Sequence, residues 1–111
     1  MDTQLKVSQL QDNTAVIRPV GRLNMVVAPK LRDLVSGTVA GGRARIVVDL
    51  TDTTFIDSSG LGALVAGLKT TRAAGGDLRL ACAPAQVVTA LELTNLNRVF
   101  RTYTSVDESL G

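Results

Sequence analysis

The stretch FIDSSGLGAL, residues 55–64, holds the side chains of this sequence whose types and spacing could support chemistry. It places one carboxyl group, Asp57, beside two hydroxyl groups, Ser58 and Ser59, and two glycines follow. We call residues 55–64 the corner. Its polar side chains could cap a helix, supply a catalytic nucleophile, bind a phosphate group, or be modified by another enzyme. Each alternative needs different neighbouring residues.

The nucleophile and the phosphate cradle both lack their usual partners. A serine-hydrolase elbow reads G-x-S-x-G, but Ile56 and Asp57 stand two positions before the two serines. The chain contains no histidine, so the commonest general base and metal ligand is missing. Neither G-x-x-x-x-G-K-[ST] nor G-x-G-x-x-G occurs, which disfavours a bound nucleotide. We therefore expect no catalytic residue, no metal ion and no cofactor here.

The other two alternatives, a helix cap and a serine that another enzyme phosphorylates, are both compatible with the residues of this stretch. The side chain of Asp57 or Ser58 can accept a hydrogen bond from an unpaired N–H of a first helical turn. A phosphate group on a serine there would add about −1.5 to −2 charges. The helix dipole would tolerate this charge, although the Asp57 carboxylate would oppose it. The fold would then survive while the surface changes sign, which is the behaviour of a binding switch.

Small residues recur along one side of the helix that should follow this corner. They stand at i, i+3, i+4 and i+7 and are Ser59, Gly62, Ala63 and Ala66. Small side chains let another backbone come close, so this side could receive a partner. They could equally pack beneath the sheet or loops of the same chain, and the sequence leaves both interpretations open.

The elements that must position this corner alternate along the chain. Hydrophobic periodicity predicts strands at residues 4–10, 15–21, 44–50, 77–82 and 98–105. It predicts helices from about Val27 to the glycines at 41–42, from 58 to about 74, over 84–96, and as a closing turn at 106–110. The order β-β-α-β-α-β-α-β-(α) indicates an α/β fold, with a mixed, mostly parallel sheet of four to five strands and three to four helices.

Several local features carry expectations of their own. Turn-forming residues 11–14 should join the first two strands into a hairpin, and Gly21 should end the second strand. Pro19 should lie at a strand end, a bulge or an open edge, because it cannot donate to a ladder. Residues 51–56 should be a polar connection ending in two core anchors, Phe55 and Ile56. The helix over 84–96 should turn four side chains to the core: Val87, Val88, Leu91 and, as a further candidate, Leu93.

Composition excludes several function classes. Of the 111 residues, 45% are apolar, which allows a sizeable core, but only 3% are aromatic. The net charge is +2 and the basic residues are scattered, which argues against a direct nucleic-acid surface. The single cysteine, Cys82, should be a small buried apolar residue, and it cannot form an internal disulfide. With no membrane-spanning run and no signal-peptide pattern, we expect one soluble, cytoplasmic domain over residues 1–111.

The segment VVDLTDTTFIDSSGLGALVAGLK resembles the signature of bacterial anti-sigma factor antagonists, whose domain is called STAS. The resemblance extends over nearly the whole chain. Its further parts, in the family's order, are the opening hairpin, GRLN, RIVVDL, GGDLRL and ALELTNLNRVF. The resemblance implies the STAS fold and a protein that is a monomer when free, has no cofactor and is not itself an enzyme.

The same resemblance implies a switch between partners. The unphosphorylated form would bind an anti-sigma factor that is also a serine kinase, and this binding would free the sigma factor. The kinase would use ATP to phosphorylate Ser58, the first serine after the aspartate, and a metal-dependent serine phosphatase would reverse the reaction. Together with the small-residue side of the following helix, this gives the expected partner-binding set: Arg22, Asn24, Asp57, Ser58, Ser59, Gly60, Gly62, Ala63 and Ala66.

The sequence departs from the family pattern after the second strand. The family usually has G-E-L-D there, whereas this chain has Gly21-Arg22-Leu23-Asn24, so two acidic positions carry a base and a neutral amide. The change could alter which kinase is recognised. It also motivates an alternative function, in which the protein is a STAS scaffold or regulatory subunit of a transporter ATPase or stress-signalling complex and is never phosphorylated.

Overall fold

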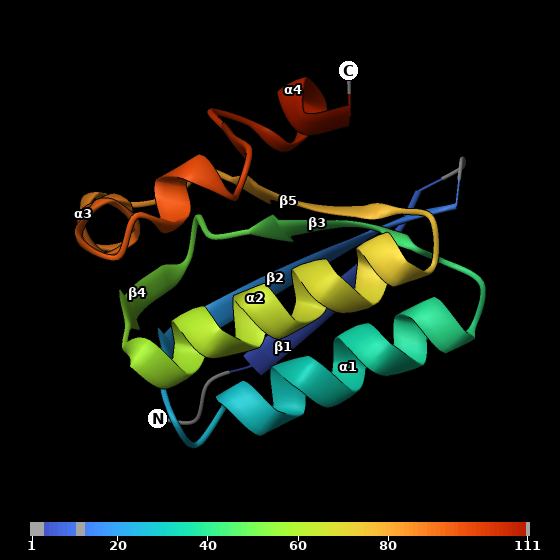
Figure 1. Ribbon diagram of the computed structural model, residues 1–111, viewed down its shortest axis with the longest axis horizontal. Coiled ribbons are helices and arrows are strands. Elements are labelled where there is room, and N and C mark those ends of the chain that lie inside the picture. The colour runs from blue at the N-terminus through green and yellow to red at the C-terminus, as the bar shows by residue number, and fades with distance from the viewer. Residues whose placement is uncertain (1–3, 11–12, 111) are drawn as a thin grey trace.

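The computed structural model describes residues 4–10 and 13–110. Its helices are α1 (Ala28–Ala40), α2 (Ser58–Ala73), α3 (Ala85–Leu93) and α4 (Val106–Leu110), with a 3₁₀ turn at Leu96–Arg98 (Figure 1). Its strands are β1 (Gln4–Gln9), β2 (Thr14–Leu23), β3 (Arg45–Asp49), β4 (Thr53–Ile56), β5 (Asp77–Ala81) and β6 (Thr102–Tyr103). The predicted mixed α/β architecture is confirmed, with one more strand than the sequence indicated.

The sheet is antiparallel at one edge and parallel elsewhere. Its order is β1-β2-β3-β5-β6, and β4 pairs with β2 beyond the end of β3. β1 and β2 form the predicted antiparallel hairpin, and every other strand pair among the described residues is parallel. Two residues of the predicted turn, 11 and 12, lie outside the described residues, but Asn13 has a left-handed backbone, with a φ of 61°, which is typical of asparagine in turns.

β2 does not end at Gly21, and residues 51–56 are not merely a connection. Gly21 has a φ of 112°, and the strand register shifts between Gly21 and Arg22. β2 pairs with β3 over residues 14–17 and with β4 over residues 21–23, and the shift leaves Thr54 of β4 without a partner in β2, as in a β-bulge. Pro19 lies between the segments of β2 that pair with β3 and with β4, where no donor is needed on that side.

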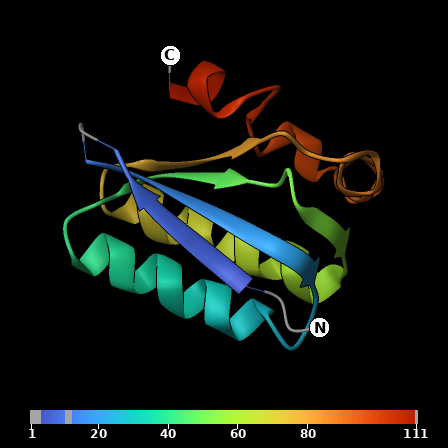
Figure 2. The same ribbon diagram turned by 180° about the vertical axis from the view of Figure 1, so that it is seen from behind.

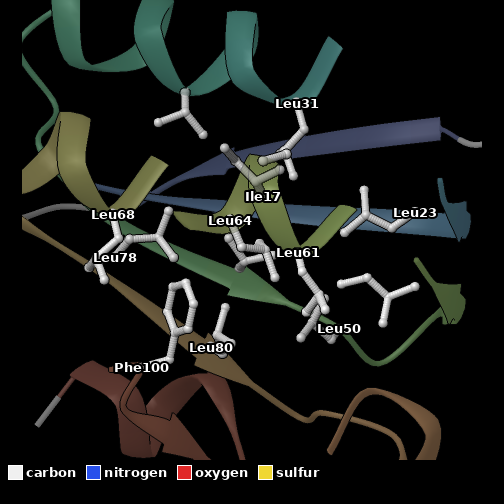
Figure 3. Packing of buried hydrophobic residues seen from close by; sticks show 14 of the residues in the cluster. Ile17, Leu23, Leu31, Leu50, Leu61, Leu64, Leu68, Leu78, Leu80 and Phe100 are labelled. Atoms are coloured by element: carbon white, nitrogen blue, oxygen red, sulfur yellow. The ribbon is translucent and has the colours of Figure 1, made fainter. Parts of the chain in front are cut away.

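Helices α1 and α2 lie side by side on one face of the sheet (Figures 1 and 2). The main core fills the space between this helix layer and the strands, and Leu31 of α1 and Leu64 of α2 are both fully buried there (Figure 3). α2 contributes three leucines to this core: Leu61, Leu64 and Leu68. On the opposite face, a small cluster of Val16, Val47 and Ala81 packs against Val106 of α4.

The helix over 84–96 is shorter than predicted, and its apolar residues divide differently. α3 ends at Leu93, and Asn95 turns into the left-handed region before the 3₁₀ turn. Val87 and Leu91 are buried as expected, but Val88 and Leu93 are exposed. The prediction that the latter two face the core is therefore wrong, because one face of a nine-residue helix meets the core.

Cys82 is half-buried rather than fully buried. It follows β5 with a left-handed backbone, a φ of 58°, and its thiol donates to the Thr104 carbonyl oxygen at 3.4 Å. The residue therefore packs at the margin of the smaller core cluster.

Candidate functional site

Asp57 caps α2 and ties it to a neighbouring loop. Its backbone is extended, with φ −112° and ψ −174°, so its side chain turns back over the first helical turn. One carboxylate oxygen, Oδ1, accepts the Gly60 N–H at 2.9 Å. The other, Oδ2, accepts the Met25 N–H at 3.2 Å, from the segment between β2 and α1. The predicted capping role of Asp57 is thus confirmed, and its carboxylate also joins two parts of the chain.

Ser58 is the first residue of α2, and its side chain is exposed. Ser59 is half-buried. Within the described part of the chain, neither serine hydroxyl makes a hydrogen bond. An enzyme could therefore reach the Ser58 hydroxyl without first breaking an internal contact.

Gly60 permits the close packing on which this corner depends. A Cβ atom at position 60 would stand 2.2 Å from the Leu23 carbonyl oxygen and 2.8 Å from Cγ1 of Ile56. The start of α2 is thus pressed against the ends of β2 and β4, at a distance that only glycine allows. Gly60 is buried, so the structure assigns it to packing and not to a surface that a partner could touch.

The small residues of α2 do not share one open face. Ala63 is fully buried in the main core, so the prediction that it contacts a partner is wrong in this conformation. Gly62 is half-buried and faces α1, where a Cβ atom would stand 3.3 Å from a terminal nitrogen of Arg32. Ala66 is half-buried as well. Gly62 is partly covered because α1 packs against α2, and Ala63 is part of the main core, so packing within the chain accounts for much of the stripe.

Arg22 and Asn24 lie at the end of β2, beside the start of α2. Arg22 is paired with Phe55 across β2 and β4, and its guanidinium carbon lies 5.7 Å from the centre of the Phe55 ring. Asn24 folds back on its own loop, where its Oδ1 accepts the Val26 N–H at 3.1 Å. Both residues therefore belong to the corner around Asp57.

Phe55 does not anchor the corner in the core. It is 39% exposed beneath Arg22, whereas Ile56 is 2% exposed and anchors as predicted. The reason is that residues 53–56 form a strand, in which successive side chains point to opposite sides. The run Thr53-Thr54-Phe55-Ile56 is rich in β-branched residues, and this was the signal that could have identified β4.

Two further exposed apolar residues adjoin the corner and were not predicted. Met25 is 70% exposed and Val26 is 66% exposed. Phe55 lies in β4, directly before Asp57, and Met25 and Val26 lie in the connection that is hydrogen-bonded to Asp57. Both segments therefore carry exposed apolar side chains near Asp57. Two large apolar residues in the short connection between a strand and a helix were the available signal.

The described residues contain no group of three or more His, Cys, Asp or Glu side chains placed to hold a metal ion. No helix in the described part of the chain is long and apolar enough to cross a membrane. What the corner offers chemically is an accessible hydroxyl at a capped helix N-terminus.

Comparison with known proteins agrees with this geometry. The family model of the STAS domain matches residues 6–109. A Thermotoga maritima protein named "putative anti-sigma factor antagonist" is 29% identical over 103 residues, which are 92% of this chain and 91% of that protein. The crystal structure of an anti-sigma factor antagonist from Mycobacterium paratuberculosis is 26% identical and superposes with a TM-score of 0.85 over 98% of this chain and 92% of that one.

The fold is also that of SpoIIAA, an anti-sigma factor antagonist. Its unphosphorylated form is 20% identical to this chain, with a TM-score of 0.84 over 96% of this chain and 93% of that one. The phosphorylated form of SpoIIAA from Bacillus is 19% identical, with a TM-score of 0.77 and 96% of each chain covered. With the matched family model, the strand order and the position of DSSGLG at the start of α2, these likenesses identify the chain as a member of the STAS-domain family.

Proposed function

We propose that this protein is an anti-sigma factor antagonist switched by phosphorylation of Ser58. In the unmodified state the corner around Ser58 binds an anti-sigma factor that is also a serine kinase, and the bound sigma factor is released. The kinase then transfers the γ-phosphoryl group of ATP to the Ser58 hydroxyl, and a serine phosphatase later removes it. The observation that carries the proposal is the exposed Ser58 hydroxyl at the capped N-terminus of α2.

The local electrostatics support a switch in binding rather than in folding. A phosphate group at the first turn of α2 faces the positive end of a sixteen-residue helix, which offsets part of the cost of the new charge. The same charge in a contact surface that has lost its water is strongly unfavourable unless the partner supplies a cation. Phosphorylation therefore leaves the fold in place while it removes the partner.

The phosphorylation site is tested with kinase-type anti-sigma factors from the source organism. Each is incubated with this protein and ATP, and the modified residue is identified by mass spectrometry. We expect one phosphate group on the wild type and on the matched control Ser59→Ala, and none on Ser58→Ala. Equal phosphate uptake by Ser58→Ala would show that the site assignment is wrong.

A second candidate is a STAS scaffold that regulates a transporter ATPase or a stress-signalling complex and is not phosphorylated. It is favoured by one observation, the exposed pair of Arg22 and Phe55 beside the corner, where the family pattern has an acidic residue. Affinity purification from the source organism with mass spectrometry separates the two functions. Recovery of a transporter ATPase, with no phosphoserine in the protein from cells, would favour the scaffold.

A further inference from the structure

The segment between β2 and α1, residues 24–27, forms a turn that is held by its own hydrogen bonds. We call it the 24–27 turn. Asn24 Oδ1 accepts the Val26 N–H at 3.1 Å, and the Asn24 carbonyl oxygen accepts the Val27 and Ala28 N–H groups at 3.1 and 2.8 Å. The turn exposes the side chains of Met25 and Val26. It is therefore a compact unit that carries apolar surface.

One hydrogen bond links this unit to the start of α2 among the residues that the structure describes. It runs from the Met25 N–H to Oδ2 of Asp57 at 3.2 Å. The same carboxylate caps α2 through Oδ1, at the shorter distance of 2.9 Å from the Gly60 nitrogen. Asp57 thus bridges the 24–27 turn and the helix that begins with Ser58.

A phosphate group on Ser58 would act directly on this bridge. It would bring about −1.5 to −2 charges and three acceptor oxygens next to the Asp57 carboxylate. The Ser58 and Ser59 N–H groups have no acceptor within the described part of the chain, so the phosphate can bind at this helix end and compete for the Gly60 N–H. Repulsion between the two anions then favours movement of the carboxylate. The bond to Met25 is the longer and more exposed of its two bonds, so it is the one expected to break first.

We propose that Asp57 is a positioning residue that couples the charge on Ser58 to the 24–27 turn. Phosphorylation withdraws the carboxylate from Met25, and the exposed tip of the turn, Met25 and Val26, moves while Val27 stays buried in the main core. A partner then meets both a new charge at Ser58 and a displaced apolar surface at Met25 and Val26. This inference rests on the proposed function for the identity of the modified serine.

The test uses the full chain without any partner, with phosphoserine placed at position 58 during translation. Hydrogen exchange of backbone amides is followed by NMR. We expect the Met25 amide to exchange about tenfold faster in the phosphorylated protein, which corresponds to the loss of one hydrogen bond. The Val27 and Ala28 amides should keep their protection, because their bonds lie within the turn. Phosphoserine at position 36, an exposed site on α1, is the matched control and should leave Met25 unchanged.

A second variant separates coupling from a general loosening of the corner. The variant Asp57→Ser can still cap α2 through its hydroxyl oxygen, but its shorter side chain has no second oxygen in the place of Oδ2, which accepts from Met25. We expect this variant to show fast Met25 exchange by itself, with no further change when position 58 carries phosphoserine. Equal Met25 exchange in the unmodified and phosphorylated wild type would overturn the inference. So would a full phosphate effect in the Asp57→Ser background.

These outcomes are independent of the proposed function. Coupling is measured on the free protein, whereas the proposed function depends on phosphorylation by a kinase and on binding to it. A protein that loses its partner on phosphorylation while Met25 exchange stays constant would retain the proposed function and exclude the coupling.

Discussion

Gly60 lies so close to Leu23 that a Cβ atom on residue 60 would stand 2.2 Å from the Leu23 carbonyl oxygen. The end of β2 and the start of α2 therefore meet backbone to backbone. This contact fixes the place of Ser58 relative to Asn24 and Arg22, and it makes the corner sensitive to one methyl group.

The change Gly60→Ala is expected to lower the free energy of unfolding by about 3 kcal/mol, because the added methyl group meets backbone that cannot move aside. Gly37→Ala is the matched control, since a Cβ atom there has nothing within 4 Å. Gly37 lies inside α1, so this change should stabilise the protein by about 0.5–1 kcal/mol. Urea denaturation measures both. Stability of Gly60→Ala equal to that of the wild type would contradict the packing described for this corner.

Removal of the Asp57 cap should weaken the fold without abolishing it. Asp57→Ala leaves the Gly60 and Met25 N–H groups without their acceptor, and we expect a loss of about 1–2 kcal/mol of unfolding free energy. Asp57→Ser retains a capping oxygen and should lose clearly less. The comparison is made by thermal and urea unfolding, and an equal loss in the two variants would argue that capping is not the stabilising contribution.

Phe55 and Ile56 should differ sharply although they are neighbours. Ile56→Ala empties a buried site and should cost about 2–5 kcal/mol of unfolding free energy. Phe55→Ala removes an exposed ring and its contact with the Arg22 guanidinium, which is a contribution of about 0.5–1 kcal/mol. Denaturation of the two variants side by side tests this. If Phe55→Ala proved the more damaging, the ring would have to be a core anchor after all.

A negative charge at position 58 should leave stability nearly unchanged. In Ser58→Glu the helix dipole favours the carboxylate and the neighbouring Asp57 opposes it, so we expect a change within about 0.5 kcal/mol. Ser59→Glu is the matched control, and it should cost more because Ser59 is half-buried. The melting temperatures of both variants, compared with that of the wild type, measure these changes in stability. A strongly destabilised Ser58→Glu would indicate that charge at this position switches folding and not binding.

The sequence predicted the parts of the fold in which local pattern and burial agree. β3 and α2 lie within one residue of their predicted bounds, because a run of apolar residues that is buried in β3 and leucines at helical spacing in α2 agree with their burial. β4 was missed because it is four residues long and pairs with the far end of β2 through a register shift, which no local pattern reports. The positive φ of Gly21 depends on how β2 pairs within the sheet, and not on its neighbours in the sequence.

The candidate site was predicted in part for a similar reason. Capping by Asp57 depends on residues within one helical turn, so the sequence could indicate it. The bond between Met25 and Asp57 joins residues 32 positions apart, and the burial of Ala63 comes from its place in the main core. Both depend on how elements pack, and the spacing of small residues on one helix does not contain that information.

Under the proposed function, the charge state of Ser58 decides whether this protein binds its kinase-type anti-sigma factor. Titration calorimetry measures this binding, with the unmodified chain and the chain carrying phosphoserine at position 58 each titrated against that anti-sigma factor. We predict binding of the unmodified form and an affinity weaker by about 100-fold or more for the phosphorylated form, since the new charge would be buried without a partner. Equal affinity of the two forms would contradict the claim.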